Sequence, residues 1–240
     1  MTEVRLSKYL SSKGLCSRRE ADRYIADGLV TVDGEVVLDA WFRVLPEHNV
    51  VMASSAQKAQ QQMLTVLLNK PLGYVSAQAE EGQVNSARLL QSENYYGGGK
   101  PPRINRKKAF APAGRLDINS TGLLVLTQDG RVAGKLIGNN VEIEKEYLVR
   151  HKGAVSDSQI SEMRSGLQLD GRDLKTAKIQ RVNEDQIRLV LIEGKKRQVR
   201  RMCEAVGLEL FALKRVRVGK VRLGDLPLGK WRTLAKGEEF

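Results

Sequence analysis

The chain has 240 residues, which suffices for one large domain or two modest ones. Its hydrophobic content of 41% exceeds that of disordered chains, so we expect a folded protein with a core of its own. No run of apolar residues is longer than four, whereas a membrane-spanning helix needs about 20, which excludes membrane insertion. The 40 Lys and Arg outnumber the 28 Asp and Glu, and the net charge of +12 makes a polyanion the first partner to test.

The N-terminal residues and the cysteines together indicate a cytoplasmic protein. The chain starts with charged, helix-patterned sequence, including Arg5, Lys8 and Lys13, in place of the apolar region of a secretion signal. Its only cysteines, Cys16 and Cys203, are far apart in the sequence. They form neither a disulfide framework nor the spacing of a metal site, so we expect no bound metal.

The positive charge is unevenly distributed along the chain. Residues 190–236 hold thirteen basic and four acidic residues, a net charge of +9. Residues 1–52 are nearly neutral, with seven basic and eight acidic residues, yet six of the basic ones fall within the first 23 positions. A third basic segment, residues 100–108, follows three glycines and has the composition of an exposed flexible loop. Three separated basic patches indicate an extended binding surface.

Residues 1–52 predict a small module in which helices precede a β-hairpin. Ser17 and Glu20 have the spacing of a capping box, which starts a helix that Gly28 is placed to end. Asp33-Gly34 is a strong tight-turn signal between two short apolar segments, residues 29–32 and 35–38. Residues 53–62 are small and polar without an apolar period, so we interpret 53–63 as a linker.

Residues 64–240 predict a second domain that is rich in strands. One helix is expected to open at Ser156 with Gln159 as its capping partner, and another over 196–206 with Gly207 as its stop. Because the strands follow one another with few helices between them, we expect an α+β domain with a mainly antiparallel mixed sheet and flanking helices. The expected strands are 65–69, 123–127, 145–150, 177–182, 186–193 and 211–218.

Several common catalytic and cofactor sites are excluded by their spacing. His48 and His151 lie in different modules, so neither a histidine-based triad nor a metal cluster is expected. The glycines before Lys100 superficially look like a phosphate-binding loop, but position 94 is Asn instead of the first Gly, and Pro101 follows the lysine. We therefore expect neither nucleotide hydrolysis nor a nucleotide cofactor. Cys203 stands at helical spacing after Val199 and is expected in the core.

Two segments admit both a structural and a functional interpretation. Asp117 is a carboxylate in a turn-like stretch just before an apolar strand, and an aspartate there is often only a turn or capping residue. Residues 193–202 open a basic helix with five cations in seven positions, which can be a solvated charged face. Such closely spaced cations repel one another unless an anion faces them, and this favours a polyanion partner.

Four ordered motifs together resemble the RsuA-type pseudouridine synthases of ribosomal RNA. They are Leu68-Asn-Lys-Pro-Leu-Gly-Tyr74, Gly114-Arg-Leu-Asp117 followed by Thr121-Gly-Leu-Leu, Lys145-Glu-Tyr-Leu-Val149, and Gly194-Lys-Lys-Arg-Gln-Val-Arg-Arg-Met202. The N-terminal module is similar to the small RNA-binding domain that these enzymes share with a small-subunit ribosomal protein and tyrosyl-tRNA synthetases. The resemblance covers nearly the whole chain.

The resemblance implies conversion of uridine to pseudouridine without a cofactor. The N-glycosidic bond breaks, the base turns, and it is rejoined through carbon 5. Asp117 matches the family's nucleophile, Tyr147 the tyrosine that stacks on the target base, and Arg200 the basic residue that pairs with the aspartate. Arg115 is expected to help hold the flipped nucleotide.

The expected partner is ribosomal RNA, bound by a monomer. An RNA nucleotide must leave its stack to react, at a cost of a few kcal/mol, and basic side chains hold the phosphates around it. We expect RNA contacts from both modules, through Arg5, Lys8, Arg18, Arg19, Arg23, Lys70, Arg115, Lys195, Lys196, Arg197 and Arg201.

A rival interpretation is a non-catalytic RNA-binding or ribosome-assembly protein that uses only the basic surface. The set of Asp117, Tyr147 and Arg200 favours the enzyme, because a pure binder needs no nucleophile beside a pairing cation. A DNA-modifying enzyme is disfavoured by the RNA-type N-terminal module. The stretches 16–25 and 200–204 favour the branch that modifies large-subunit rRNA near the peptidyl-transferase region, whereas residues 79–111 match no family motif.

Overall fold

The computed structural model describes residues 2–106, 108–138 and 141–240. Its contacts divide the chain into two compact units. The first comprises Met1–Thr65, Ile104–Ala111 and Thr127–Gly138, and the second Val66–Arg103, Pro112–Leu126 and Asn139–Phe240. The first unit thus adds later segments to the module predicted over 1–52, and the boundaries of the functional domains stay a prediction.

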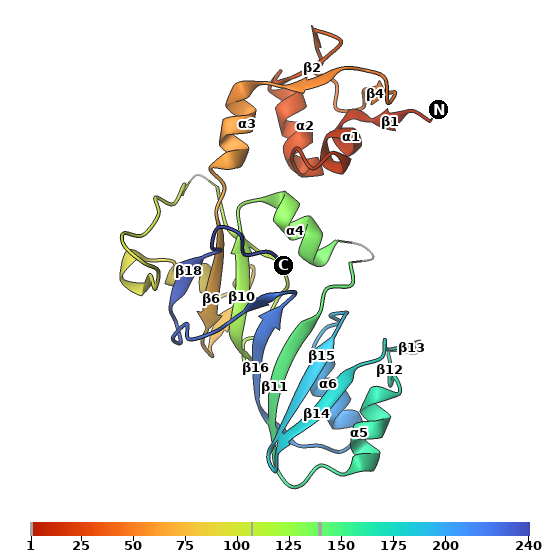
Figure 1. The fold of residues 1–240 in the computed structure, drawn as a ribbon, viewed down its shortest axis with the longest axis vertical. Coiled ribbons are helices and arrows are strands. Elements are labelled where there is room, and N and C mark those ends of the chain that lie inside the picture. Colours follow the sequence, from red (N-terminus) through yellow and green to blue (C-terminus); the bar gives the residue numbers. More distant parts are fainter. Residues whose placement is uncertain (1, 107, 139–140) are drawn as a thin grey trace. The chain divides into compact units, whose positions relative to one another are not determined.

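The first unit contains the predicted helices and hairpin, together with two further helices (Figure 1). Ser17 caps the second helix: its amide donates to the Glu20 carboxylate at 2.9 Å, and the Glu20 amide donates to Ser17 Oγ at 3.3 Å. Asp33 and Gly34 both have positive φ angles, of 52° and 90°, which a type I′ hairpin turn requires. The elements are β1 (Val4–Arg5), α1 (Leu6–Ser12), α2 (Arg18–Ala26), β2 (Val30–Val32), β3 (Glu35–Val36), β4 (Arg43–Val44), β5 (Val50–Met52), α3 (Ser54–Gln61) and α4 (Gly130–Ile137).

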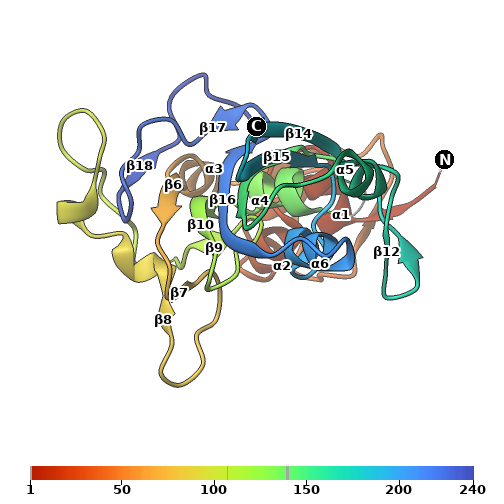
Figure 2. The same ribbon diagram turned by 90° about the horizontal axis from the view of Figure 1, so that it is seen from below.

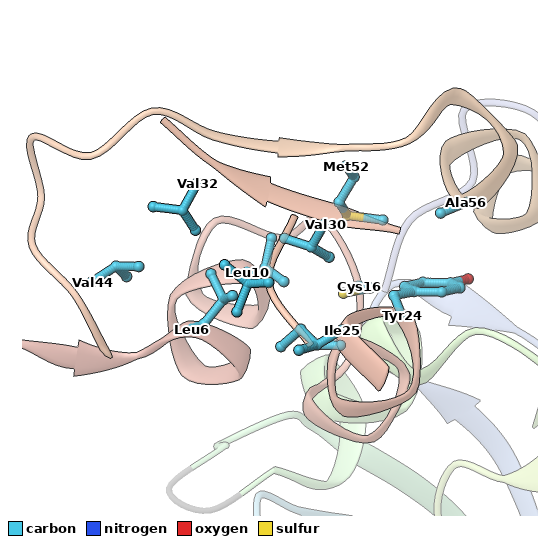
Figure 3. Packing of buried hydrophobic residues seen from close by; sticks show 12 residues of the cluster. Leu6, Leu10, Cys16, Tyr24, Ile25, Val30, Val32, Val44, Met52 and Ala56 are labelled. Atoms are coloured by element: carbon cyan, nitrogen blue, oxygen red, sulfur yellow. The ribbon is translucent and has the colours of Figure 1, made fainter. Parts of the chain in front are cut away.

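The core of the N-terminal module lies between its two first helices and the β3-β2-β5 sheet. Leu6 and Leu10 from α1, Ile25 from α2 and Val30 from β2 are completely buried and point toward one another (Figure 3). Burying four aliphatic side chains of this size contributes about 1.5–3 kcal/mol each. This small core fixes the positions of α1 and α2, which carry most of the module's basic residues.

Within the segment 53–63, which was predicted as a linker without an apolar period, residues 54–61 form helix α3, and its role as a linker between functional domains stays a prediction. Ala56 on this helix is buried in the N-terminal core, and one turn later the Gln60 side-chain amide donates to Tyr24 Oη at 2.9 Å. Ala, Gln and Lys are good helix formers, and one alanine with one glutamine is enough to make a buried face. Hydrophobic periodicity misses such a helix because its inner face is not strongly apolar.

The basic segment 100–108, predicted as an exposed flexible loop, forms hydrogen bonds and an ion pair at its C-terminal end. The Gln128 side-chain amide donates to the carbonyls of Asn105 and Lys108, at 2.8 and 2.6 Å. Lys108 Nζ forms an ion pair with the buried Glu20 of α2. Position 107 lies outside the described residues. These contacts join residues 104–111 to the first unit.

The second unit is built on a nine-stranded sheet with the order β14-β15-β11-β16-β10-β6-β18, while β17 pairs with β16 and β9 with β10 (Figure 1). The β10–β16 pair is parallel, whereas β11–β15, β11–β16, β14–β15, β16–β17 and β6–β18 are antiparallel. The strands of this sheet are β6 (Thr65–Lys70), β9 (Ala111–Pro112), β10 (Thr121–Thr127), β11 (Lys145–His151), β14 (Lys178–Asn183), β15 (Gln186–Leu191), β16 (Leu210–Val218), β17 (Val221–Arg222) and β18 (Trp231–Thr233).

Two helices cover one half of this sheet. Helices α5 (Asp157–Arg164) and α6 (Gln198–Ala205) contact β14 and β16 respectively and lie on the same face (Figure 2). The capping box of Ser156 with Gln159 is present, and Gly207, at φ 70°, follows α6. Short elements complete the unit: β7 (Tyr74–Val75), β8 (Val84–Asn85), β12 (Gln168–Leu169), β13 (Arg172–Asp173) and the 3₁₀ turns Ser86–Leu89 and Ser92–Asn94.

The predicted α+β class with a mainly antiparallel mixed sheet is confirmed, as are the six predicted strands. Cys203 is completely buried, as expected. Helix α4 was not predicted, although Asp129 caps it by accepting from the Arg131 amide at 2.9 Å. None of the helices in the described ranges is long and apolar enough to cross a membrane.

Candidate active site

Residues 114–120, here called the Asp117 turn, connect β9 to β10. Asp117 itself is half-buried, and Arg115, Ile118 and Asn119 are exposed. Each backbone carbonyl from Gly114 to Asn119 accepts a hydrogen bond. A turn held at every carbonyl presents its side chains in one fixed arrangement, which a reactive carboxylate needs.

The first half of the Asp117 turn is held by two buried side chains. The Arg215 guanidinium on β16 donates to the carbonyls of Gly114 and Arg115, at 3.1 and 3.2 Å, and its Nε donates to Leu123 O at 2.8 Å. Ser76 Oγ donates to Leu116 O at 2.6 Å and accepts from the Leu116 amide at 2.9 Å. Arg215 is 1% exposed, so this cation is directed at backbone rather than at solvent.

The second half is held by backbone amides and two further cations. The Ser120 amide donates to Asp117 O at 3.0 Å, and the Gly73 amide donates to Ile118 O at 3.0 Å. Lys70 Nζ reaches Ile118 O at 3.5 Å, and Arg200 Nη2 donates to Asn119 O at 2.6 Å. The turn is therefore fixed from strand β6, from the loop that follows it and from helix α6.

Lys70 is a structural cation, and the expectation that it contacts RNA was wrong. It is completely buried at the end of β6, and its Nζ also donates to Pro71 O at 2.7 Å and Tyr74 O at 2.9 Å. Burial lowers the pKa of Lys70 to about 8, although the nearby Asp117 charge opposes this by raising it. A side chain without solvent exposure cannot bind a phosphate on the surface.

Arg200 lies over the Asp117 turn without a direct ion pair to the aspartate. Among the described residues no Arg200–Asp117 contact falls within 4.0 Å, and the guanidinium binds Asn119 O and, at 3.5 Å, Ser120 Oγ. Burial lowers the pKa of Arg200 and the Arg197 charge lowers it further, while Asp117 raises it. Asp117 is thus close enough to Arg200 to affect it electrostatically. In place of the expected direct ion pair, Arg200 donates a hydrogen bond to the backbone of the Asp117 turn.

Tyr147 is placed on the sheet beside Arg215. The two residues are directly opposite each other across β11 and β16, and the β11–β16 register shifts between Glu146 and Tyr147. Such a bulge re-aims the side chains around it, and opposite residues present their side chains to the same face. Tyr147 is 8% exposed. Its predicted role against the target base stays a prediction, but its neighbour is the residue that fixes the Asp117 turn.

The remaining predicted RNA contacts fall into two groups. Arg201 forms a bidentate ion pair with Asp170, with its shorter distance 2.7 Å, and Lys195 Nζ donates to Asp173 O at 3.2 Å. Arg5 is half-buried, and its guanidinium carbon lies over the ring of Trp41. The other side chains are exposed and available to an anion, and their roles stay predictions: Lys8, Arg18, Arg19, Arg23, Arg115, Lys196 and Arg197.

Sequence reasoning missed the residues that support the turn, Arg215 and Ser76 above all. A signal for Arg215 was present, because it stands among apolar residues at alternating positions of a strand, where a cation needs buried acceptors. Gly122, one residue into β10, has a φ of 101°, and a Cβ there would lie 2.2 Å from Arg215 O. That position admits only glycine because the parallel neighbour β16 runs so close.

Within the described ranges, no group of three or more His, Cys, Asp or Glu side chains is arranged to hold a metal ion. Lys70 and Arg200 interact electrostatically with Asp117, whose charge opposes the lowering of their pKa by burial. The site combines one half-buried carboxylate, these two cations and a tyrosine that lies opposite Arg215. Such a set can support nucleophilic attack by the carboxylate on a neutral substrate.

Comparison with known proteins shows the family to which the chain belongs. The family model for RNA pseudouridylate synthases matches residues 64–205, and that of the S4 domain matches residues 4–50. The dual-specificity RNA pseudouridine synthase RluF of Escherichia coli is 34% identical over 241 residues, which cover 99% of this chain and 77% of RluF.

Two other relatives cover nearly their whole length. The ribosomal small subunit pseudouridine synthase A of Escherichia coli is 34% identical over 98% of both chains. An uncharacterized RNA pseudouridine synthase of Aquifex aeolicus is 33% identical over 99% of this chain and 93% of its own. A crystal structure of a pseudouridylate synthase covers 98% of this chain and 97% of its own with a TM-score of 0.66 at 24% identity, which supports the fold. The predicted family is thereby confirmed: the chain belongs to the RNA pseudouridylate synthases and carries an S4 domain at its N-terminal end.

Proposed function

We propose that this protein converts a uridine of ribosomal RNA to pseudouridine and that Asp117 is the nucleophile. The observation that carries the proposal is the Asp117 turn, in which every carbonyl from Gly114 to Asn119 is held while the aspartate side chain is left beside Lys70 and Arg200. The positive charges of Lys70 and Arg200 attract the carboxylate, since the Asp117 charge acts to raise the pKa of both cations against the effect of burial. An ionised carboxylate is the form that attacks.

The reaction is an isomerisation, so all atoms of the nucleotide are retained. A carboxylate oxygen of Asp117 bonds to the nucleotide, and the bond between ribose carbon 1′ and base nitrogen 1 breaks with its electron pair going to the base. The base then turns, carbon 5 bonds to carbon 1′, the proton on carbon 5 is lost and nitrogen 1 gains one. Asp117 is released with its electron pair. No oxidant, reductant or cofactor is needed to balance these steps.

Two further residues handle the flipped nucleotide in this proposal. Extrusion of the uridine costs a few kcal/mol, and stacking on Tyr147 can return about 1–3 kcal/mol of it. Arg115 is exposed on the Asp117 turn and its carbonyl is fixed by Arg215, so its guanidinium is placed to hold the backbone beside the extruded base. The protein is expected to act as a cytoplasmic monomer.

The sequence also supports a proposal for which ribosomal RNA is the substrate. The stretches 16–25 and 200–204 favour large-subunit rRNA near the peptidyl-transferase region. The names of the relatives include both a dual-specificity enzyme and a small-subunit enzyme, so the target has to be measured.

Mapping pseudouridines in rRNA tests this proposal in cells that lack the protein. We expect one large-subunit pseudouridine to disappear and to return when wild-type protein is supplied. An Asp225→Asn protein, altered at an exposed aspartate, should also restore it, whereas Asp117→Asn should not. An unchanged pseudouridine map in cells that lack the protein would contradict the proposed activity. Restoration of the pseudouridine by Asp117→Asn would contradict the role of Asp117 as nucleophile and favour a non-catalytic binding protein.

A further inference from the structure

Trp41 is unusually exposed for its size. Of the large hydrophobic side chains in the described ranges it is the most exposed, at 69%, whereas the chain's only other tryptophan, Trp231, is 1% exposed. Its indole therefore adds little to the core of the N-terminal module. A large aromatic ring in water loses the burial free energy that normally stabilises it, so the ring needs an explanation other than packing.

The backbone around Trp41 is fixed although its side chain is exposed. The Trp41 amide donates to Asp39 Oδ1 at 2.8 Å, and the Phe42 amide donates to Asp39 O at 3.1 Å. The Leu6 amide donates to Phe42 O at 2.8 Å, which ties this segment to the start of α1. An aromatic ring on a rigid turn can bind a flat partner without the entropic cost of ordering its own backbone.

One cation, Arg5, lies over the ring, and two further cations, Arg43 and Lys8, are close to Arg5 along the chain or across the strand pair. The guanidinium carbon of Arg5 lies 3.5 Å from the centre of the Trp41 ring. Arg43 is directly opposite Arg5 in the β1–β4 pair, so both side chains point to the same face, and Lys8 is exposed one helical turn further on.

In the part of the chain that the structure describes, these three cations have no anionic partner. Among the described residues no carboxylate lies within 4.0 Å of the charged groups of Arg5, Lys8 or Arg43. The Arg5 Nε is buried and lacks a hydrogen-bond partner there. Like charges directly opposite on a sheet repel each other, and an anion brought in by a ligand would relieve that repulsion.

We propose that Trp41 and Arg5 form a stacking site for an unpaired RNA base, flanked by phosphate contacts from Arg43 and Lys8. An aromatic ring backed by a guanidinium offers a π-face to a base of any sequence, and single-stranded RNA is commonly bound in this way. The cations select a polyanion over an uncharged apolar partner. The inference rests on the RNA substrate of the proposed function and adds a contact separate from the Asp117 turn.

Tryptophan fluorescence of the full-length chain tests the stacking site directly. Because Trp231 is buried, Trp41 is the tryptophan whose emission a bound base can quench. Oligouridylate should quench the emission, whereas inorganic polyphosphate, which carries charge without bases, should not. Trp41→Ala should remove the quench and weaken oligouridylate binding about 5- to 100-fold. Trp41→Tyr, which keeps a ring, should bind nearly as wild type.

The salt dependence separates stacking from charge. Trp41→Ala should leave the slope of log affinity against log salt unchanged, while Arg43→Ala should reduce it by about 0.7. RNA binding without a change in Trp41 emission, or wild-type affinity in a folded Trp41→Ala protein, would overturn the inference. RNA should quench the emission of the Asp117→Asn protein as strongly as that of wild type. Loss of pseudouridine formation with this quenching intact therefore concerns the proposed function and leaves the stacking site supported.

Discussion

At the scale of single residues, three buried or half-buried cations of the site bind the backbone of the Asp117 turn. Lys70, Arg200 and Arg215 all donate to carbonyls of the Asp117 turn or of the strand beside it. A hydrogen bond from a charged donor contributes about 1.5–3 kcal/mol, and a buried carbonyl left without a donor costs a similar amount. Precision at Asp117 therefore depends on residues that need not touch RNA.

Replacing Arg215 by Lys tests this dependence. An ammonium cannot reproduce a planar fork that reaches three carbonyls, so the Asp117 turn should relax and single-turnover pseudouridine formation should fall about 100-fold, with RNA affinity unchanged. The matched control is Arg217→Lys on the same strand, whose guanidinium pairs with Glu144 and Glu146 and should leave the rate nearly unchanged. A wild-type rate in Arg215→Lys would contradict the account.

Lys70 predicts a pH dependence. Its pKa is lowered to about 8 by burial, so the folded protein loses this charge as pH rises through 8, and the support that it gives to Asp117 weakens. The single-turnover rate should therefore decline above pH 8. The free energy of unfolding should instead rise with pH between the lowered pKa of folded Lys70 and the ordinary Lys pKa. In this range the unfolded chain keeps the proton while the folded protein has lost it, so the cost of burying the charge disappears.

The Lys70→Met protein is the control for that profile. It should be slow at every pH, because the carbonyls of Pro71, Tyr74 and Ile118 lose a donor, and its profile should lack the alkaline decline. The same decline in wild type and Lys70→Met, measured between pH 7 and 9.5, would assign it to another group.

The sequence predicted the family, which the relatives confirm, and the nucleophile Asp117, which stays a prediction, but it did not predict how the Asp117 turn is supported. The order of the motifs suffices to place a chain in a known family. Whether a basic side chain faces solvent or backbone depends on which strands become neighbours. The sequence therefore predicted Lys70 as a phosphate contact and Arg200 as the partner of the aspartate. In the structure Lys70 is completely buried, and Arg200 donates to the carbonyl of Asn119.

At the scale of elements, the close parallel pairing of β10 and β16 depends on Gly122. This residue is directly opposite Arg215 and has a φ of 101°. Gly122→Ala should destabilise the protein by about 2–5 kcal/mol, through backbone strain and a clash with Arg215 O. Gly134→Ala on α4, where a Cβ meets no atom within 4 Å, should instead be neutral or stabilising by up to about 1 kcal/mol. Thermal or urea unfolding of both proteins measures the difference, and equal stability would contradict this interpretation.

Local signals predicted some elements well and others not at all. Helices α2 and α5 have capping boxes within four consecutive residues, and the β2–β3 turn has Asp-Gly, so neighbours in sequence suffice. Helix α3 has an inner face that is only weakly apolar, and α4 contains Gly130 and Gly134, which are poor helix formers. The sheet order was not predictable because β16 separates β10 from β11, although β16 follows both in sequence.

At the scale of the whole molecule, the net charge of +12 overstates the free cations. Arg201, Arg215 and Arg217 are bound within the protein, whereas Arg18, Arg19 and Arg23 on α2 are exposed. Changing these three α2 residues to Gln should reduce the slope of log RNA affinity against log salt by about 2–3. Arg201→Gln should change it little. An unchanged slope in the triple variant would show that the S4 domain's α2 does not bind phosphate.

The central claim is that Asp117 is the nucleophile of an RNA pseudouridine synthase. Its most direct test is single-turnover pseudouridine formation by purified Asp117→Asn protein, on the rRNA fragment that contains the mapped uridine. We predict RNA binding like that of wild type with no detectable pseudouridine, because an amide cannot attack as a carboxylate does. Formation of pseudouridine at the wild-type rate by Asp117→Asn would contradict the account.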